Sequence, residues 1–487
     1  MDTDVLVVGA GPTGLVLANE LRLAGVPAVL VDKLPRRSTL SKAGGVQSRT
    51  QEAFDQRGLL EPLLATGNHP IGTAHFAGLA LPLTRDRHRH PWRSIPQVVI
   101  EGFLEHYLAA QGIHVRRDHE LTGLTQDEDG VTATFAGGAV IRSRHLVAAD
   151  GGRSTVRSLL KAAFPGRPGT RTTVAADVRL SGADRTITHT RSDDGHWVSV
   201  FPLGTDARGR PLRRLALGGP GRSLPREVPV TEDEIRDGLH AVFGSRVRLL
   251  ELRYARRITN AARQASRYRH GRVFLAGDAA HVHLPIGAQG MNTGIQDALN
   301  LGWKLAAAVH GWAPAHLLDT YHTERHPVGA AVLRNVQAQS LLMDQEGTSD
   351  PDVTAAKDLF AALTRLRDVQ YHLDDTLSGM GIRYPMPGTG TQPLVGLPAP
   401  DLDLGPVRSH ELLRSGRGLL IDPGRRFGKT AELWSDRVDH VGTGADLEPM
   451  LIRPDGYVCW AGTPENLGPA LGHWFGEPRQ TRTGRNK

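Results

Sequence analysis

The stretch DVLVVGAGPTGLVLANELRLAGVPAVLVDK, residues 4–33, has the pattern of a strand, a glycine-rich turn, a helix and a second strand. The first strand is a continuous apolar run, which is typical of a buried parallel sheet. The turn carries GxGxxG, completed by Gly9, Gly11 and Gly14. These glycines permit the tight turn, the approach of a pyrophosphate and the packing of helix on strand. The second strand ends at Asp32, where an acid is expected to bind a ribose hydroxyl. The stretch therefore predicts a dinucleotide site and leaves NAD and FAD open.

The composition indicates a globular chain of several domains. At roughly 150 residues per domain, 487 residues allow about three. No apolar stretch approaches the ~20 residues that span a bilayer, and the N-terminus lacks the basic region of a signal peptide. The single cysteine, Cys459, excludes an internal disulfide and fits a cytoplasmic location. The net charge is +7, but no run of five like charges occurs, which favours attraction of a phosphorylated cofactor over nucleic-acid binding.

Two further stretches place an acid and glycines after an apolar run. HLVAADGGRSTVRSLL, residues 145–160, reads as a strand, then Asp150, then the start of a helix. GDAAHVHLPIGAQGMNTGIQDALNLGWKLAAAV, residues 277–309, follows another apolar strand with Asp278, a glycine-rich bend and a long helical pattern. Such a bend leaves backbone N–H groups bare at a helix N-terminus, where anions bind. The neighbouring carboxylate suggests a ligand that also carries hydroxyl groups.

The three motifs together carry a resemblance. GxGxxG near the N-terminus, DG near position 150 and GD near position 278 resemble the flavoprotein aromatic hydroxylases of the para-hydroxybenzoate hydroxylase fold. The resemblance extends through RTQEAFDQRGLL (49–60) and LLDTYHTERHPVG (317–329), and within the family it is strongest to the aromatic polyketide hydroxylases and rifampicin monooxygenase. It implies an α/β fold with a Rossmann-like FAD-binding domain, an inserted β-sheet substrate domain and a C-terminal thioredoxin-like domain.

The resemblance and the strand pattern also suggest domain boundaries. The FAD-binding domain is expected at 1–170 plus 265–340, and the substrate sheet at 171–264 with strands from 70–96. Residues 341–387 read as helical, and a turn-rich linker opens a thioredoxin-like domain at 388–487. That domain lacks CxxC, so it cannot exchange dithiols, and a structural or oligomer-supporting role is favoured, with Cys459 buried. Trp197, Ser199 and Phe201 share one strand face, which we expect to be sheet core rather than substrate pocket.

The resemblance assigns roles to single residues. Asp278 would accept hydrogen bonds from the ribityl chain of FAD, and Gln97 would also reach that chain. Backbone N–H groups of Gly290, Met291 and Asn292, at the N-terminus of the helix that follows the bend, would meet the pyrimidine edge, where a positive dipole stabilises anionic reduced flavin. Pro285 and Gly287 would shape the loop beside the reacting flavin. The implied cofactor-binding residues are Gly9, Gly11, Pro12, Thr13, Gly14, Asp32, Lys33, Lys42, Arg49, Gln97, Leu121, Asp150, Asp278, Pro285, Gly287, Gln289, Gly290, Met291 and Asn292.

Several of these assignments depart from the family or have an alternative. Relatives usually carry arginine where this chain has Lys42, and lysine lacks the planar bidentate fork. Lys33 would lie over the adenine, and Leu121 would meet it through its backbone. Arg157 is equally a ligand contact or a helix-surface charge. Three residues of the helix that follows the bend are expected on its polar face or as caps: Asp297, Asn300 and Lys304.

Other chemistries find little support. Neither histidine pair has the HExxH context of a zinc site, so no metal is expected. His281 and His283 are expected to shape the flavin turn, and His88 and His90 a solvated loop. The absence of GxSxG argues against a hydrolase of that type.

The predicted function is that of an FAD monooxygenase that uses NAD(P)H and O2. The family chemistry forms a flavin C4a-hydroperoxide, which hydroxylates a bulky phenolic or quinonoid polycyclic substrate of polyketide type. No side chain is assigned as a catalyst. The alternatives are a same-fold Baeyer–Villiger or antibiotic-inactivating monooxygenase, a flavin reductase or dehydrogenase, and a non-catalytic flavin-binding protein. A homodimer is compatible with the resemblance, and no membrane partner is expected.

Overall fold

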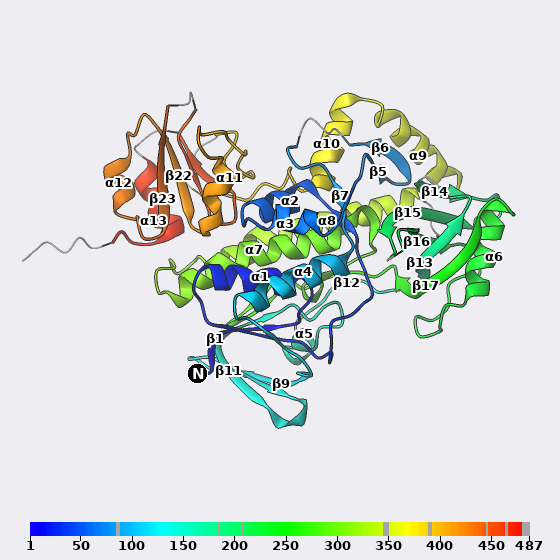
Figure 1. Cartoon of the computed structure of the whole chain (residues 1–487), viewed down its shortest axis with the longest axis horizontal. Coiled ribbons are helices and arrows are strands. Elements are labelled where there is room, and N and C mark those ends of the chain that lie inside the picture. The colour runs from blue at the N-terminus through cyan, green and yellow to red at the C-terminus, as the bar shows by residue number, and fades with distance from the viewer. Residues whose placement is uncertain are drawn as a thin grey trace, which may run out of the picture.

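The computed structural model describes residues 1–83, 88–183, 186–206, 208–343, 350–387, 392–444, 447–462 and 466–479. Figure 1 shows a central sheet with its helices, with a second sheet (within residues 172–259) on one side and the C-terminal domain on the other. Residues 388–391 of the predicted linker and 480–487 of the predicted C-terminal domain lie outside the described ranges. In the part of the chain described, no helix is long and apolar enough to cross a membrane.

The central sheet brings the three sequence motifs to one edge. Its parallel strands are β8 (Val115–Arg116), β2 (Ala28–Val31), β1 (Thr3–Val8), β11 (Val140–Ala148) and β20 (Val273–Leu275). The antiparallel strands are β19 (Arg269–His270), which borders β20, and β9 (Leu121–Gln126) and β10 (Val131–Phe135), which extend β11. Val8 is in register with Val31 and with Ala148, and Ala148 with Leu275. Each motif turn follows one of these residues, so ligand-binding turns converge at the carboxyl edge of the sheet, as expected for this topology.

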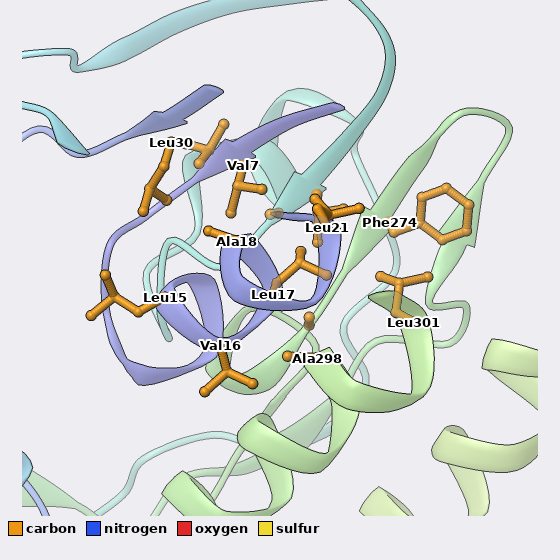
Figure 2. Packing of buried hydrophobic residues seen from close by; sticks show 14 of the residues in the cluster. Val7, Leu15, Val16, Leu17, Ala18, Leu21, Leu30, Phe274, Ala298 and Leu301 are labelled. Atoms are coloured by element: carbon orange, nitrogen blue, oxygen red, sulfur yellow. The ribbon is translucent and has the colours of Figure 1, made fainter. Parts of the chain in front are cut away.

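Helices cover this sheet and fix the turns. The helices of this part are α1 (Pro12–Leu23), α2 (Ser48–Asp55), α3 (Leu60–Ala65), α4 (Gln97–Ala110), α5 (Thr155–Leu159), α7 (Gln289–Val309) and α8 (Thr320–Leu342). Figure 2 shows Leu17 of α1 in the core with Ala298 and Leu301 of α7. The two helices can approach closely because Gly302 has no side chain. A Cβ at this position would lie only 2.5 Å from the Glu20 Cβ. The N-termini of both helices are thereby held beside the same sheet edge.

A second, antiparallel sheet has order β14-β15-β16-β13-β17. Its strands are β13 (Thr172–Ser181), β14 (Ile187–Arg191), β15 (Trp197–Thr205), β16 (Pro211–Gly218) and β17 (Arg248–Thr259), and α6 (Glu232–Phe243) covers one face. Val198 and Val200 pack toward α6. Strand alternation turns Trp197, Ser199 and Phe201 to the opposite face. Trp197 and Ser199 are buried there, as predicted for core residues, whereas Phe201 is half-buried. There Phe201 stacks on His75, with ring centroids 5.5 Å apart.

Short elements connect the two sheets. They are β3 (Gly45–Val46), β4 (His69–Pro70), β5 (Thr73–Phe76), β6 (Leu79–Pro82), β7 (Arg93–Ser94), β12 (Gly166–Arg167), β18 (Ala262–Gln264), β21 (His281–Val282), and the 3-10 turns η1 (Ala136–Gly138), η2 (Gly277–Ala279) and η3 (Ile286–Ala288). Phe76 of β5 and Ile286 of η3 share one apolar cluster with residues of α8 and of the helix α10. The helices α9 (Pro351–Leu363) and α10 (Arg367–Ser378) occupy the segment read as helical.

The C-terminal domain has the connectivity βαβ followed by ββα. Its strands are β22 (Gly418–Pro423), β23 (Val438–Thr443), β24 (Met450–Ile452) and β25 (Val458–Ala461), in the order β23-β22-β24-β25. Its helices are α11 (Ser409–Leu412), α12 (Gly428–Glu432) and α13 (Leu467–Phe475), and η4 (Leu413–Ser415) follows α11. Only β22 and β23 are parallel, as in a thioredoxin-like sheet. Cys459 is buried in this domain, and burial raises the pKa of its thiol.

Candidate functional site

In the first turn, Gly9 and Gly14 are closely packed, whereas Gly11 has open space beside it. Gly9 has φ +106°, and a Cβ there would lie 2.3 Å from the Ala149 carbonyl oxygen. A Cβ at Gly14 would lie 1.9 Å from the Gly9 carbonyl oxygen. A Cβ at Gly11, by contrast, would meet no atom within 4 Å. Gly11 also precedes α1 without a side-chain cap, so the first N–H groups of the helix have no partner within it, as at helix N-termini that bind anions.

Asp32 fixes this turn. One carboxylate oxygen accepts a hydrogen bond from the Ala10 N–H at 2.8 Å, and the other from the Leu34 N–H at 2.9 Å. Arg117, which the sequence did not single out, lies 3.8 Å from the same carboxylate. A carboxylate has about four lone-pair positions, so Asp32 keeps acceptor capacity for a ribose hydroxyl. The side chain of Lys33 is exposed beside it.

The second turn holds a half-buried acid with one buried, unpartnered oxygen. Asp150 Oδ2 accepts a hydrogen bond from the Val156 N–H at 3.1 Å, whereas its buried Oδ1 has no partner among the described residues. Burial raises the pKa of this carboxyl. Arg157 is not a surface charge: its guanidinium donates to the carbonyl oxygens of Ala279, at 2.9 Å, and Gly152, at 2.8 Å. Arg157 therefore ties the second turn to the third.

The third turn presents an acid and a helix N-terminus. Asp278 is exposed although both of its neighbours are buried, and no described residue donates a hydrogen bond to its carboxylate. Gly287 and Ala288 have φ +70° and +54°, and α7 then begins without a side-chain cap. The N–H groups of Gly290 and Met291 lie in its first turn, where they have no partner within the helix. Pro285 is exposed at the start of the same bend.

Asn292 holds this bend against the segment before α2. Its side chain donates to the carbonyl oxygens of Gly45, at 2.9 Å, and Ala288, at 2.7 Å, and accepts from the Gln47 N–H at 3.1 Å. A Cβ at Gly45 would lie 2.7 Å from the Ala288 Cβ, so the two segments are in close contact. Asn292 thus acts through its side chain on the loop geometry, a role that its sequence position did not reveal.

The remaining predicted contacts are scattered. The Gln97 amide donates to Glu101 Oε1 at 2.7 Å, at the start of α4. Leu121 is buried where β9 begins, and Lys42 is exposed. Gln289 lies inside the bend, where its amide reaches the Ile286 carbonyl oxygen at 3.5 Å, and the Thr13 hydroxyl packs against Gly277 and Gly294.

Arg49 faces the C-terminal domain. Its side chain is 1% exposed, donates to the Asp455 carbonyl oxygen at 2.7 Å and lies over the ring of Tyr457. Its other hydrogen-bond partner is Glu52, at 3.2 Å. Arg49 therefore connects helix α2 to the C-terminal domain.

The polar residues of α7 are buried, so their prediction as a polar face is wrong. Asp297 accepts hydrogen bonds from Arg325 Nε at 2.6 Å and from the Gly277 N–H at 3.0 Å, and lies 2.9 Å from His281 Nε2. Burial alone would raise the pKa of Asp297, but the charges of Arg325 and His281 outweigh it and hold this pKa at about 2. His281 thus braces the third turn.

Further along α7, Lys304 pairs with Glu324 at 2.8 Å, and Asn300 donates to the same carboxylate. Burial lowers the pKa of Lys304 to about 8, despite the neighbouring carboxylate. These two side chains are as buried as Asp297, and they face α8 rather than solvent.

Two histidines expected in a solvated loop are also paired with acids. His88 Nε2 lies 3.2 Å from Asp374, and His90 Nε2 lies 3.2 Å from Asp55. Asp55 further belongs, with Asp401 and His410, to the one group of possible metal ligands among the described residues. Arg408 binds both of its carboxylates, and Arg414 and Arg89 each bind one of them, so the negative charge that a cation would need is already neutralised.

Comparison with known proteins decides the family. An FAD binding domain family matches residues 2–336, and an aromatic-ring hydroxylase C-terminal family matches residues 392–478. The chain is 42% identical to the rifampicin monooxygenase of Streptomyces venezuelae, over 97% of this chain and 98% of the relative. This chain belongs to the FAD-dependent aromatic-ring hydroxylases. The hydroxylase is therefore a flavin-dependent monooxygenase, and the predictions of family, fold class and enzyme class are confirmed.

Two more comparisons place the hydroxylase within the family. It is 40% identical to the 12-dehydrotetracycline 5-monooxygenase/anhydrotetracycline 6-monooxygenase of Streptomyces rimosus, over 98% of this chain and all of the relative. The solved structure of the anhydrotetracycline hydroxylase OxyS from S. rimosus superposes with a TM-score of 0.87, at 39% identity, covering 98% of this chain and 100% of that one. The likeness extends through the C-terminal domain.

Proposed function

We propose that this hydroxylase uses NAD(P)H and O2 to hydroxylate a bulky, polycyclic aromatic substrate of polyketide type. The observation that carries the proposal is the meeting of three ligand-ready turns at one sheet edge, beside a second sheet with an aromatic face. The similar proteins are named for rifampicin and anhydrotetracycline, which favours a large substrate. When bound, FAD supplies the electron transfer and the activation of O2.

Each turn would bind a different part of FAD. The open side of Gly11 and the N-terminus of α1 would receive the pyrophosphate, and Asp32 a ribose hydroxyl. Asp278 would accept hydrogen bonds from the ribityl chain, since its exposed carboxylate lies at the end of β20. The N–H groups of Gly290 and Met291 would lie at the pyrimidine edge of the flavin, where the positive helix end stabilises negative charge.

The outer residues of the predicted set extend this site. Gln97 would contact the ribityl chain, Lys33 and Leu121 the adenine, and Lys42 a phosphate or the flavin. The buried free oxygen of Asp150 supports a hydrogen-bond role at the second turn. We leave Arg49 out, because its guanidinium is committed to Glu52 and Asp455.

The aromatic face of the second sheet would hold the substrate. Phe201 and His75 stack on the side away from α6, and β5, which carries His75, shares an apolar cluster with the bend at Ile286. Stacked rings suit a flat aromatic ligand, which gains both apolar burial and ring contact. Burial lowers the pKa of His75 to about 4, so its imidazole is neutral at pH 7 and can bond a phenol without adding charge.

A labelling experiment tests the proposal. The purified holoenzyme is incubated with NADPH, 18O2 and a panel of polycyclic phenols, and consumption of NADPH and product mass are measured. We expect one or more phenols to stimulate NADPH oxidation and to gain one 18O atom at a ring carbon. Stimulation without label would indicate a reductase or dehydrogenase.

A second candidate is inactivation of an antibiotic by the same chemistry, which the 42% identity to a rifampicin monooxygenase favours. It is tested by adding rifampicin to the panel. Label in ring-opened or ester products rather than in a phenol would identify this outcome or a Baeyer–Villiger reaction.

A further inference from the structure

The loop Arg453–Tyr457 of the C-terminal domain is linked to α7 through Glu324 of α8 and to α1 through Arg57. Arg453 pairs with Glu324 at 2.6 and 2.9 Å, and Glu324 binds Asn300 and Lys304 of α7. On the other side of the loop, the carbonyl oxygen of residue 454 accepts from Arg57, which forms a bidentate pair with Glu20 of α1. The loop thus lies behind the site, at the far side of α1 and α7.

A buried chain of contacts runs from this loop to the third turn. Tyr457 stacks on Tyr384, with ring centroids 4.0 Å apart. The Tyr384 hydroxyl accepts a hydrogen bond from Arg325 Nη1 at 3.0 Å. The other two guanidinium nitrogens of Arg325 bind Asp297, at 2.6 Å, and the carbonyl oxygen of Thr293, at 3.0 Å. Every nitrogen of this guanidinium therefore has a partner, and its orientation is fixed.

This series of contacts ends at the Gly277 backbone, beside Asp278. Asp297 accepts a hydrogen bond from the Gly277 N–H at 3.0 Å, so the carboxylate determines where the turn points its next residue. Arg325 also binds the first turns of α7 through Thr293. A buried ion pair contributes little net stability, because desolvation offsets the attraction. The fixed geometry of the ion pair can still orient a neighbouring group. In metal sites, residues that hydrogen-bond to the metal ligands orient those ligands in the same way.

We propose that Tyr384 and Arg325 are positioning residues for FAD, through which the C-terminal domain holds Asp278 and the N-terminus of α7 in place. The inference rests on the proposed FAD contacts of these two features. It gives a domain without dithiol chemistry a role in the cofactor site. Neither residue touches the cofactor in this arrangement, since both act through Asp297 and the backbone.

Two matched variants test the role. Tyr384→Phe removes the hydroxyl that orients Arg325 and keeps the ring stack. Tyr457→Phe removes the hydroxyl of the other ring, which is not among the partners of Arg325, and both tyrosines are 2% exposed. For each variant, the dissociation constant of FAD is measured by titrating the FAD-free protein, together with its Tm and the visible circular dichroism of the holoenzyme.

We expect Tyr384→Phe to weaken FAD binding about three- to tenfold and to change the flavin dichroism. This is less than the full effect of a lost hydrogen bond to a charged group, because the hydroxyl acts on the cofactor site only through Arg325. Tyr457→Phe should stay within about twofold of the parent. The Tm of FAD-free Tyr384→Phe should lie below that of Tyr457→Phe, because a buried guanidinium N–H loses its acceptor, so both titrations are made at a temperature where both variants are folded. Parent-like FAD affinity in Tyr384→Phe, or equal weakening in both variants, would overturn the proposal, because a merely structural stack would respond alike to either change.

Arg325→Lys provides a stronger change that keeps the charge. We expect a larger loss of FAD affinity than in Tyr384→Phe, because lysine cannot bind three partners in fixed directions. Asp278→Ala in the same titration separates the inference from its basis. Unchanged affinity in Asp278→Ala would remove the proposed cofactor contact. Weakened affinity there, with parent-like affinity in both Tyr384→Phe and Arg325→Lys, would overturn the positioning role alone.

Discussion

Two aspartates of one short segment, Asp278 and Asp297, have opposite environments. Asp278 is exposed at the turn, and no described residue donates a hydrogen bond to it. Asp297 is fully buried, and Arg325, His281 and the Gly277 N–H occupy its oxygens. The difference teaches how to assign polar residues near a cofactor site. A carboxylate without protein partners is available to a ligand, whereas one with all partners in place holds the structure.

Removing the buried acid should have the largest effect. In Asp297→Ala the charge of Arg325 loses its carboxylate and stays buried, which costs about 3–5 kcal/mol of unfolding free energy. Chemical denaturation of the FAD-free protein measures the loss. Asp297→Asn is the control, since it keeps the shape and one acceptor. If Asp297→Ala lowers the free energy of unfolding by less than about 1 kcal/mol, Asp297 does not hold the structure and does not differ from Asp278 in this respect.

Lowering the pH should destabilise the protein by protonating Asp297. The pKa of Asp297 is about 2 in the folded protein and about 3.9 in an unfolded chain, so its lowered pKa stabilises the fold fully above pH 4. As the pH falls from 4 toward 2, about 2–3 kcal/mol of stability should disappear. Urea denaturation at several pH values checks this. In Asp297→Asn the same pH interval should show a shallower decline, and an identical slope would assign the effect to other acids such as Glu324.

Removing the exposed acid, Asp278, should affect FAD binding and not the stability of the fold. We expect Asp278→Ala to weaken FAD binding on the order of ten- to a hundredfold, because charge-assisted hydrogen bonds to the ribityl chain are lost. The Tm of the FAD-free protein should change little, since the side chain is exposed and no described residue donates a hydrogen bond to it. Fluorescence titration and thermal unfolding measure the two quantities. A large drop in Tm would show that Asp278 resembles Asp297 after all.

The smallest effect is expected at the exposed Lys42. Lys42→Arg restores the usual family residue, and we expect FAD affinity to stay within about twofold of the parent or to tighten. Turnover of a substrate found in the phenol panel gives a second readout. A loss of more than tenfold would mean that the exposed side chain is as constrained as a buried one.

Arg157 and Arg49 show what the local sequence can and cannot predict about a residue's partners. Arg157 lies next to the DG motif, but its partner Ala279 is 122 residues away, so only the folded chain reveals that it joins two turns. Arg49 lies in a segment that resembles cofactor-binding relatives, yet its guanidinium meets Asp455, 406 residues further on. In both cases the residue type indicated an anion or carbonyl partner. The partner itself depended on the packing of distant elements.

The sequence by itself determined the turns, and the family resemblance that these turns carry implied the cofactor. GxGxxG, the DG turn and the GD turn are local patterns, because a tight turn, a close backbone approach and a bare helix N-terminus are set by a few consecutive residues. Only the tertiary structure decided the surroundings of those turns. Spacing along α7 places Asp297, Asn300 and Lys304 on one face but cannot say whether that face meets water or Arg325 and Glu324. Alternation in β15 likewise defines two faces, and the position of α6 alone made Val198 the core side and Phe201 the other.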